Sequence, residues 1–314
     1  MTTDPNLLPL PELYALFARS GLIRRLCELA RDEDLGARGP LAGDITSRMC
    51  LDSTRKVTAK MVVRSGGVVA GLAVLPDLIQ AFGGGIEFTA SAQDGQAVSP
   101  GATIATLSGM EQDVLTLERA ALNFVGRLSG VATRTEAFVR EMSTKGGVRS
   151  HLYDTRKTTP GLRVLEKYAV RCGGGRCHRI GLYDAVLIKD NHLAGVALQD
   201  LTEFVSSTAR RARAERPDLL FVEIEVDSLV QLEQVLKAEP GLIDVVLLDN
   251  MGLDDLRRAV ELRDRSHSAP QLEASGGVRF ETVRAIAETG VERISAGTLT
   301  HGAVWLDVAL DIVP

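Results

Sequence analysis

The sequence predicts an α/β protein in which a small sheet-containing domain precedes a parallel α/β barrel. After residue 148, short apolar runs that end in polar residues alternate with amphipathic segments every roughly 20 to 35 residues, which is typical of βαβ units. Between residues 57 and 107, β-like pieces are separated by glycine-containing turns. We favour a barrel of fewer than eight strands over an open doubly wound sheet, because no GxGxxG fingerprint follows an early strand.

The first part of the chain is predicted to surround a small sheet with helices. Residues 1–34 are expected to be helical, because Leu22, Leu26 and Leu29 recur at helical spacing. The segments expected to be β-like are 57–63, 67–74 and 97–107. A long helix is expected over 111–142, where apolar residues form one continuous stripe.

The barrel strands are predicted at six apolar runs, and the polar residues that end them are candidates for a site. The runs are 151–155, 184–190, 221–227, 244–250, 271–277 and 293–297. Because the carboxyl ends of barrel strands meet at one mouth, their polar residues should lie together. In chain order these residues are Arg156, Lys157, Lys189, Glu225, Asp249, Ser275, Gly276, Gly277 and Gly297.

The residue types at these strand ends indicate an anionic substrate and a magnesium ion. Arginine and lysine bind carboxylate or phosphate groups. Glu225 and Asp249 follow neighbouring strands, and such carboxylates suit Mg²⁺. The small residues after the last two strands let backbone N–H groups approach a phosphate. The sequence therefore predicts a magnesium-assisted reaction between a sugar phosphate and an anionic partner.

Composition and charge exclude several other classes of protein. The 314 residues have a net charge of −5, but residues 149–192 carry nine basic and four acidic side chains. The acidic total argues against a general nucleic-acid binder. No run of about 18 apolar residues could span a membrane, and the first residues lack the basic region of a signal peptide. Four scattered cysteines do not form a disulfide framework, so we expect reduced thiols and a cytoplasmic protein.

Several motifs, in order along nearly the whole chain, resemble the quinolinate phosphoribosyltransferase family. The most specific is DTRKTTPGLRVLEKYAVRCGGGRCHRIGLYDAVLIKDNH at 154–192. The others are GDITS (43–47), LERAALNFVGRLSGVAT (117–133), EIEVDS (223–228), LLDN (247–250), EASGG (273–277) and ETGVERISAGTLTH (288–301). This resemblance implies the type II phosphoribosyltransferase fold, an incomplete α/β barrel with an amino-terminal mixed α/β sandwich-like domain. The expected domains are 1–133, joined by 299–314, and a catalytic barrel over 134–298.

The resemblance also implies a reaction and a homodimer. The family transfers the phosphoribosyl group of phosphoribosyl pyrophosphate to quinolinate with loss of CO₂, giving nicotinate mononucleotide and pyrophosphate for NAD biosynthesis. Arg119 would reach the active site of the partner subunit. Carried over by motif, the residues around the substrates are Arg119, Thr155, Arg156, Lys157, His178, Arg179, Lys189, Glu225 and Asp249. Glu225 and Asp249 would hold Mg²⁺, and Ser275, Gly276, Gly277 and Gly297 would bind the 5′-phosphate.

Three other functions are weighed against this one. A related transferase could act on a different aromatic acid, and an aldolase could form a Schiff base through Lys189. A catalytically silent binding homologue would have lost charges from the site, but Arg156, Lys189, Glu225 and Asp249 are all present. A zinc site at Cys172, Cys177 and His178 is disfavoured, because structural zinc requires four ligands.

Overall fold

The computed structural model of the chain describes residues 3–36, 43–143 and 150–313. By their internal contacts the residues form two compact units. The amino-terminal unit comprises 8–136, 158–174 and 299–314, and the barrel unit comprises 1–7, 137–157 and 175–298. The expected domain boundaries, at 133 and 298, stay a prediction. Arg149, which was counted in the basic segment, lies outside the described residues.

The amino-terminal unit is a mixed α/β structure around a four-stranded antiparallel sheet, in the order β12-β1-β5-β3. Strands β2 and β4 form a separate two-stranded ladder. The helices are α1 (Leu10–Ala18), α2 (Leu22–Leu35), α3 (Ile45–Cys50), the 3₁₀ turn η1 (Leu72–Val74), α4 (Leu75–Ala81), α5 (Glu111–Met142), α6 (Arg163–Cys172) and α12 (Thr298–His301). The strands are β1 (Lys56–Val63), β2 (Gly67–Val68), β3 (Glu87–Ala90), β4 (Ala97–Val98), β5 (Thr103–Met110) and β12 (Val308–Val313).

Alternating burial explains why strand β1 forms. Hydrogen bonds to an aspartate explain why the segment 67–74 does not continue as a strand. In β1, Val57, Ala59 and Met61 are buried and the residues between them are exposed. The β expectation for 67–74 is wrong beyond Val68. There the backbone N–H groups of residues 72 and 73 donate to the carboxylate of Asp94 at 3.0 and 3.1 Å, so the chain turns into η1 and α4.

Helix α5 confirms the long helix expected from the apolar stripe. Val114, Leu117, Val125 and Leu128 on this stripe have no exposed surface. The helix is 32 residues long, and its buried face packs in the core while its other face stays polar.

The barrel unit contains a six-stranded parallel sheet in the order β6-β11-β10-β9-β8-β7. Its strands are β6 (His151–Tyr153), β7 (Val186–Ile188), β8 (Val222–Val226), β9 (Val245–Asp249), β10 (Gln271–Ser275) and β11 (Arg293–Ser295). Its helices are α7 (Asp190–Leu193), the 3₁₀ turn η2 (Leu198–Asp200), α8 (Leu201–Glu215), α9 (Leu229–Val235), α10 (Leu253–Asp264) and α11 (Phe280–Ala287). All six predicted strands are confirmed.

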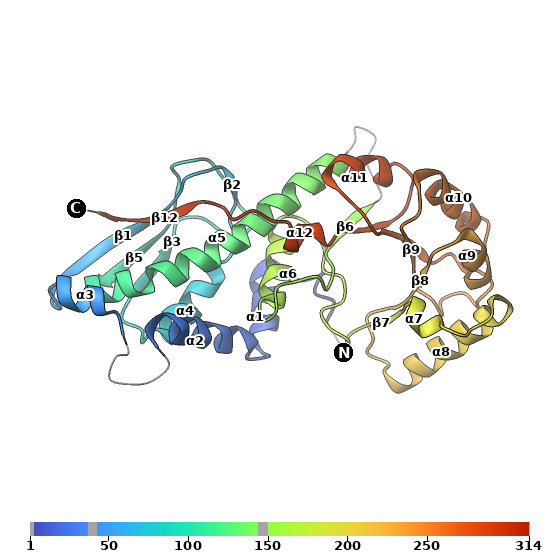
Figure 1. The fold of residues 1–314 in the computed structure, drawn as a ribbon, viewed down its shortest axis with the longest axis horizontal. Coiled ribbons are helices and arrows are strands. Elements are labelled where there is room, and N and C mark those ends of the chain that lie inside the picture. The colour runs from blue at the N-terminus through green and yellow to red at the C-terminus, as the bar shows by residue number, and fades with distance from the viewer. Residues whose placement is uncertain (1–2, 37–42, 144–149, 314) are drawn as a thin grey trace. The chain divides into compact units, whose positions relative to one another are not determined.

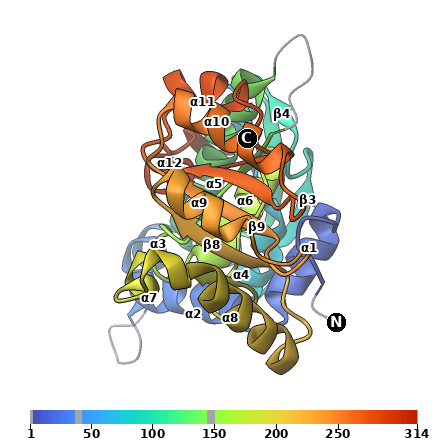
Figure 2. The same cartoon turned by 90° about the vertical axis from the view of Figure 1, so that its right-hand side faces the viewer.

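The strand order shows that this sheet is an incomplete barrel. The first strand, β6, pairs with the last, β11, so the sheet curves back toward its beginning. In the described residues, no strand ladder joins β6 to β7. Helices α8 to α11 cover the outer side of the sheet (Figures 1 and 2). No helix among the described residues is long and apolar enough to cross a membrane.

Candidate active site at the barrel mouth

Lys189 and Glu225 lie side by side at the carboxyl ends of β7 and β8. In the parallel register Ile188 lies opposite Ile224, so the next residue of each strand points to the same side. The ammonium group of Lys189 donates a hydrogen bond to Oε2 of Glu225. The lysine backbone is also fixed, because its N–H donates to Nδ1 of His192 at 2.9 Å.

The next two strands bring Asp249 and Ser275 to the same level, since they are partners in the β9–β10 register. Oδ2 of Asp249 accepts a hydrogen bond from the side chain of Asn250 at 2.7 Å, and the backbone N–H of Asn250 donates to the carbonyl of Ser275 at 2.9 Å. Gly276 adopts φ +86°, and a Cβ there would lie 2.2 Å from Oδ1 of Asn250. Only glycine allows this close approach of two strand ends.

Two arginines of like charge interact at the barrel mouth: Arg156 follows β6, and Arg179 lies between α6 and β7. Burial and the neighbouring Arg156 guanidinium lower the pKa of Arg179, while Glu223 and Asp184 oppose this shift. Arg179 is only 7% exposed, and the Nε atom of Arg156 is buried without a hydrogen-bond partner. Among the described residues, neither guanidinium is seen in an ion pair with a carboxylate. Such an arrangement is costly unless an anion binds it.

Backbone hydrogen bonds to buried aspartates fix the segment that carries Arg179. Oδ1 of Asp154 accepts from the N–H of His178 at 2.8 Å. The Asp184 carboxylate accepts from the N–H groups of Ile180 and Gly181 at 2.6 and 2.9 Å. The position of Arg179 therefore depends on carboxylates that do not themselves reach the mouth.

The remaining predicted residues are placed as follows. Oγ1 of Thr155 accepts a hydrogen bond from the N–H of Lys157 at 3.1 Å and shapes the turn after β6. Gly277 has φ +59° and open space around it, and Gly297 follows β11. Arg119 is exposed on α5 of the amino-terminal unit, and within the described residues it forms no ion pair with Glu118 or Asp113.

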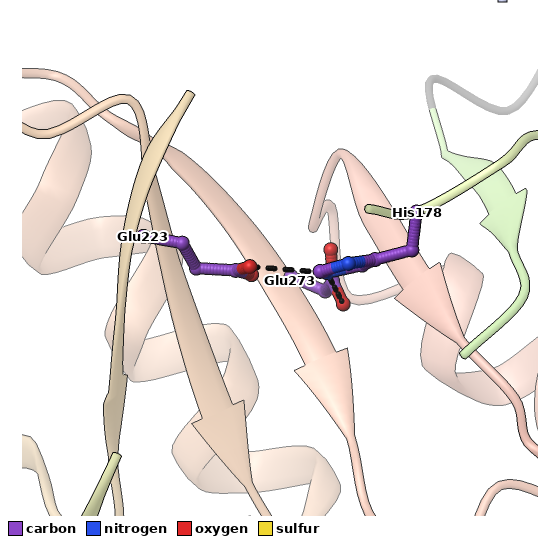
Figure 3. A group of neighbouring side chains, drawn as sticks. All are labelled: His178, Glu223 and Glu273. Atoms are coloured by element: carbon purple, nitrogen blue, oxygen red, sulfur yellow. Dashed lines mark ion pairs between the residues drawn. The ribbon is translucent and has the colours of Figure 1, made fainter. Parts of the chain in front are cut away.

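His178 lies deeper in the barrel than expected, beside the buried side chains of Glu223 and Glu273 (Figure 3). Its Nε2 lies 3.0 Å from Oε2 of Glu223 and 3.3 Å from Oε1 of Glu273. Oε2 of Glu273 accepts a hydrogen bond from Arg293 at 2.6 Å, and the Arg293 guanidinium lies 3.9 Å above the ring of Tyr153. We call His178, Glu223, Glu273 and Arg293 the interior charge cluster. Its two glutamates have no exposed surface.

The members of the interior charge cluster shift one another's pKa values. Burial opposes a charge on His178, but Glu273 and Glu223 outweigh it and raise the pKa of His178 to about 10. Burial and repulsion by Glu273 raise the pKa of Glu223. Burial also opposes the charge of Glu273, yet His178 and Arg293 hold the pKa of its carboxyl at about 2. Glu273 is therefore ionised against Arg293, while His178 and Glu223, whose pKa values are both raised, share a proton that they hold to alkaline pH.

The geometry of His178 favours a cluster of ion pairs over a metal site. Among the described residues, His178, Glu223 and Glu273 are the only group of histidine, cysteine or carboxylate side chains close enough to share an ion. However, Nδ1 of His178 accepts a hydrogen bond from the N–H of Arg179 at 2.8 Å, which places the ring proton on Nε2. A metal would need the lone pair of Nε2. Both ring nitrogens of His178 are thus engaged within the protein, and its expected contact with substrate stays a prediction.

The interior charge cluster contains three residues that sequence reasoning missed. Glu223 and Glu273 lie within strands between buried apolar residues, and Arg293 is the buried first residue of β11. A charged residue in the middle of such a strand is a signal, because buried charges need partners. Glu223 and Glu225 are two residues apart in β8, so their side chains lie on the same face of the strand. They differ in how far along the strand they lie from its carboxyl end.

The interior charge cluster predicts a loss of stability at alkaline pH. The raised pKa of His178, about 10, belongs to a proton that it shares with Glu223, so the contribution of this pair is complete below pH 6.5 and is lost as the pH rises through 10. The raised pKa of Glu223 acts in the same direction. We expect the free energy of unfolding, from urea titrations, to fall between pH 6.5 and pH 10, and to fall less steeply in His178→Gln. His267→Gln, at an exposed histidine, is the control; equal slopes in all three proteins would contradict the assignment.

Comparison with known proteins agrees with this fold along most of the chain. The model of the quinolinate phosphoribosyl transferase N-terminal domain matches residues 44–129, and that of the C-terminal domain matches 131–311. The nicotinate-nucleotide pyrophosphorylase [carboxylating] of Mycobacterium leprae is 42% identical over 271 residues, covering 86% of this chain and 91% of that protein. A probable enzyme of the same name from Bacillus subtilis is 36% identical over 280 residues, covering 89% and 90%.

Solved structures give the same result. The nicotinate-nucleotide pyrophosphorylase of Francisella tularensis superposes with a TM-score of 0.82 at 33% identity, covering all of both chains. That of Ehrlichia chaffeensis has a TM-score of 0.79 at 34% identity and covers 92% of this chain and 98% of its own. The expected incomplete barrel with an amino-terminal mixed α/β domain is confirmed. The motifs, the fold and the relatives agree, and the chain belongs to the quinolinate phosphoribosyltransferase family.

Proposed function

We propose that the barrel mouth binds quinolinate and phosphoribosyl pyrophosphate and joins them with release of CO₂ and pyrophosphate, giving nicotinate mononucleotide for NAD biosynthesis. The observation that supports this most strongly is the pair Arg156 and Arg179. The two guanidinium groups repel one another, Arg179 is buried and Arg156 half-buried, and among the described residues neither forms an ion pair with a carboxylate. Quinolinate has two adjacent carboxylates, which match two arginine forks.

Other cationic and polar side chains complete the proposed quinolinate pocket. Lys189 reaches the mouth from β7, and Thr155 and Lys157 lie on the turn that also carries Arg156. His178 supports the pocket through the backbone of Arg179, to which it is hydrogen-bonded. This arrangement favours a dianionic pyridine over nicotinic acid, whose single carboxylate would leave one arginine unpaired.

The opposite side of the mouth fits a magnesium-bound sugar phosphate. Glu225 and Asp249 end adjacent strands, and carboxylates in this position suit Mg²⁺, which holds phosphate oxygens and neutralises the charge of the leaving pyrophosphate when bound. We propose that these two residues hold the ion and the ribose hydroxyls. Ser275, Gly276, Gly277 and Gly297 would bind the 5′-phosphate, because the glycines leave backbone N–H groups accessible.

The residues act by position and charge rather than by covalent catalysis. The arginines and Lys189 hold the pyridine ring so that its nitrogen faces the anomeric carbon, which becomes cationic as pyrophosphate leaves. Once the nitrogen carries the ribosyl group, its positive charge stabilises the carbanion formed when the neighbouring carboxylate leaves as CO₂. That carbon then takes up a proton. The side chains keep the second carboxylate in place during this step.

A direct assay tests the reaction. The purified protein should release CO₂ and pyrophosphate from quinolinate and phosphoribosyl pyrophosphate in the presence of Mg²⁺, and should not use nicotinic acid. Turnover of nicotinic acid without release of CO₂ would contradict the proposal. Borohydride trapping of a substrate carbonyl on Lys189 would instead support the Schiff-base aldolase.

We also propose a cytoplasmic homodimer in which Arg119 of one subunit completes the site of the other. Arg119 is exposed and has no ion pair among the described residues, so it is available to a partner. Arg119→Ala and Lys189→Ala should each be inactive alone. A mixed dimer of the two variants should recover up to about half of the wild-type activity per dimer, because one of its two sites would contain both residues. No recovery on subunit exchange would exclude a shared site.

A further inference from the structure

We propose that Glu225 restrains Lys189 in the enzyme without substrates, so that each substrate helps the other to bind by breaking this ion pair. The inference rests on the proposed function, in which Lys189 contacts a quinolinate carboxylate and Glu225 serves the magnesium-bound co-substrate. It adds an energetic coupling between the quinolinate pocket and the site of the magnesium-bound co-substrate.

The ion pair joins residues proposed for opposite substrates. The ammonium of Lys189 is hydrogen-bonded to Oε2 of Glu225, which has no other hydrogen-bond partner among the described residues. The side chain of Glu225 is 13% exposed and that of Lys189 is 42% exposed. The carboxylate is thus held in the wall of the barrel, while the lysine reaches over it from the neighbouring strand.

Only the lysine side chain has to move for the pair to break. The lysine backbone is hydrogen-bonded to both the side chain and the backbone of His192, at 2.9 and 2.8 Å. Strand β7 is paired with β8 up to Ile188. The flexible four-carbon stem of a lysine can therefore turn from Glu225 to a ligand without a change in the sheet.

A dianion that needs Lys189 must compete with Glu225. The carboxylate of Glu225 both occupies the ammonium and repels an incoming anion. A partly exposed ion pair is worth only a modest amount, so we expect the competition to weaken quinolinate binding by about three- to fivefold, or about 0.7–1 kcal/mol. A ligand that takes over Glu225 removes this competition. By thermodynamic linkage, quinolinate that takes Lys189 makes Glu225 more available in the same proportion.

The test is a binding measurement that needs neither metal nor turnover. Titration calorimetry with quinolinate, in EDTA and without phosphoribosyl pyrophosphate, should show that Glu225→Gln binds about three- to fivefold more tightly than the wild type. A residue that only supported the fold would give weaker binding when replaced. Asp249→Asn is the matched control, because it removes one negative charge from the next strand end, where the carboxylate contacts Asn250 rather than Lys189. Its effect should be clearly smaller.

A second set of variants distinguishes the effect of losing the Lys189–Glu225 ion pair from the effect of removing a negative charge near the ligand. In a Lys189→Met background, Glu225→Gln should no longer tighten binding, and Glu225→Ala should behave like Glu225→Gln in both backgrounds. Equal or weaker binding by both Glu225 variants would overturn the inference, as would a gain that persists without Lys189. If the wild type did not bind quinolinate at all, the proposed function itself would be contradicted.

Discussion

Arg156→Met is expected to lower kcat/KM for quinolinate by about a hundredfold or more and, at the same time, to leave the Tm unchanged or raise it. The loss follows from removing one charged donor from a preorganised anion site. The effect on stability follows from Arg179, whose pKa is lowered by burial and by Arg156. Two like charges held together for a ligand destabilise the protein without it, so removing one relieves repulsion.

Steady-state kinetics and thermal unfolding of the same preparation measure both effects. Arg210→Ala is the matched control, because it removes an equal charge from an exposed pair on the outer face of α8. It should change neither quantity appreciably. Near-normal turnover in Arg156→Met, or a loss of activity that simply follows a lower Tm, would show that Arg156 is not part of the anion site.

Glu273→Gln is expected to lower the free energy of unfolding by about 3–5 kcal/mol, because it leaves the buried guanidinium of Arg293 without its counter-ion. The amide keeps the size of the side chain, so the loss reports charge rather than packing. Urea titration of the free protein measures it. Glu239→Gln, at a surface ion pair whose carboxylate is 67% exposed, should change stability by less than about 1 kcal/mol.

The double variant Glu273→Gln with Arg293→Met separates this explanation from a general intolerance of change. Removing both charges should restore most of the stability that the single variant loses, because no unpaired buried ion remains. If the two substitutions were simply additive, the pairing of Glu273 with Arg293 would not be what stabilises the barrel interior.

The sequence predicted the barrel well because its strands leave a strong local signal. Each of the six parallel strands is a short apolar run that ends in polar residues, and a strand with helices on one side and a core on the other needs that pattern. The segment 67–74 was harder. Its residues favour strands, but Asp94, more than twenty positions away, accepts hydrogen bonds from its backbone and turns it into a helical segment. Such tertiary contacts do not appear in local periodicity.

The candidate site also contains residues that the sequence predicted and a residue whose place it did not predict. Position at a strand end was enough to select Lys189, Glu225, Asp249 and Ser275. The registers place Lys189 beside Glu225 and Asp249 beside Ser275, with Asp249 two residues beyond the partner of Glu225 on β9. The buried position of His178 was not predictable from the sequence. His178 and Glu223 belong to segments far apart in the sequence that meet only inside the barrel. The family motifs named His178, but they could not distinguish a residue that touches a ligand from one that holds its neighbour in place.

The missing ladder between β6 and β7 changes what a bound substrate would do to the protein. Thr155, Arg156 and Lys157 follow β6, whose outer edge is bridged at Arg176, and Lys189 follows β7 at the opposite edge of the sheet. With quinolinate bound as proposed, its two carboxylates would link the residues that follow these two strands, which no strand ladder joins in the described part of the chain. The bound substrate would then bridge the gap between β6 and β7, and this part of the barrel would be more rigid in the enzyme with substrate than in the polypeptide alone.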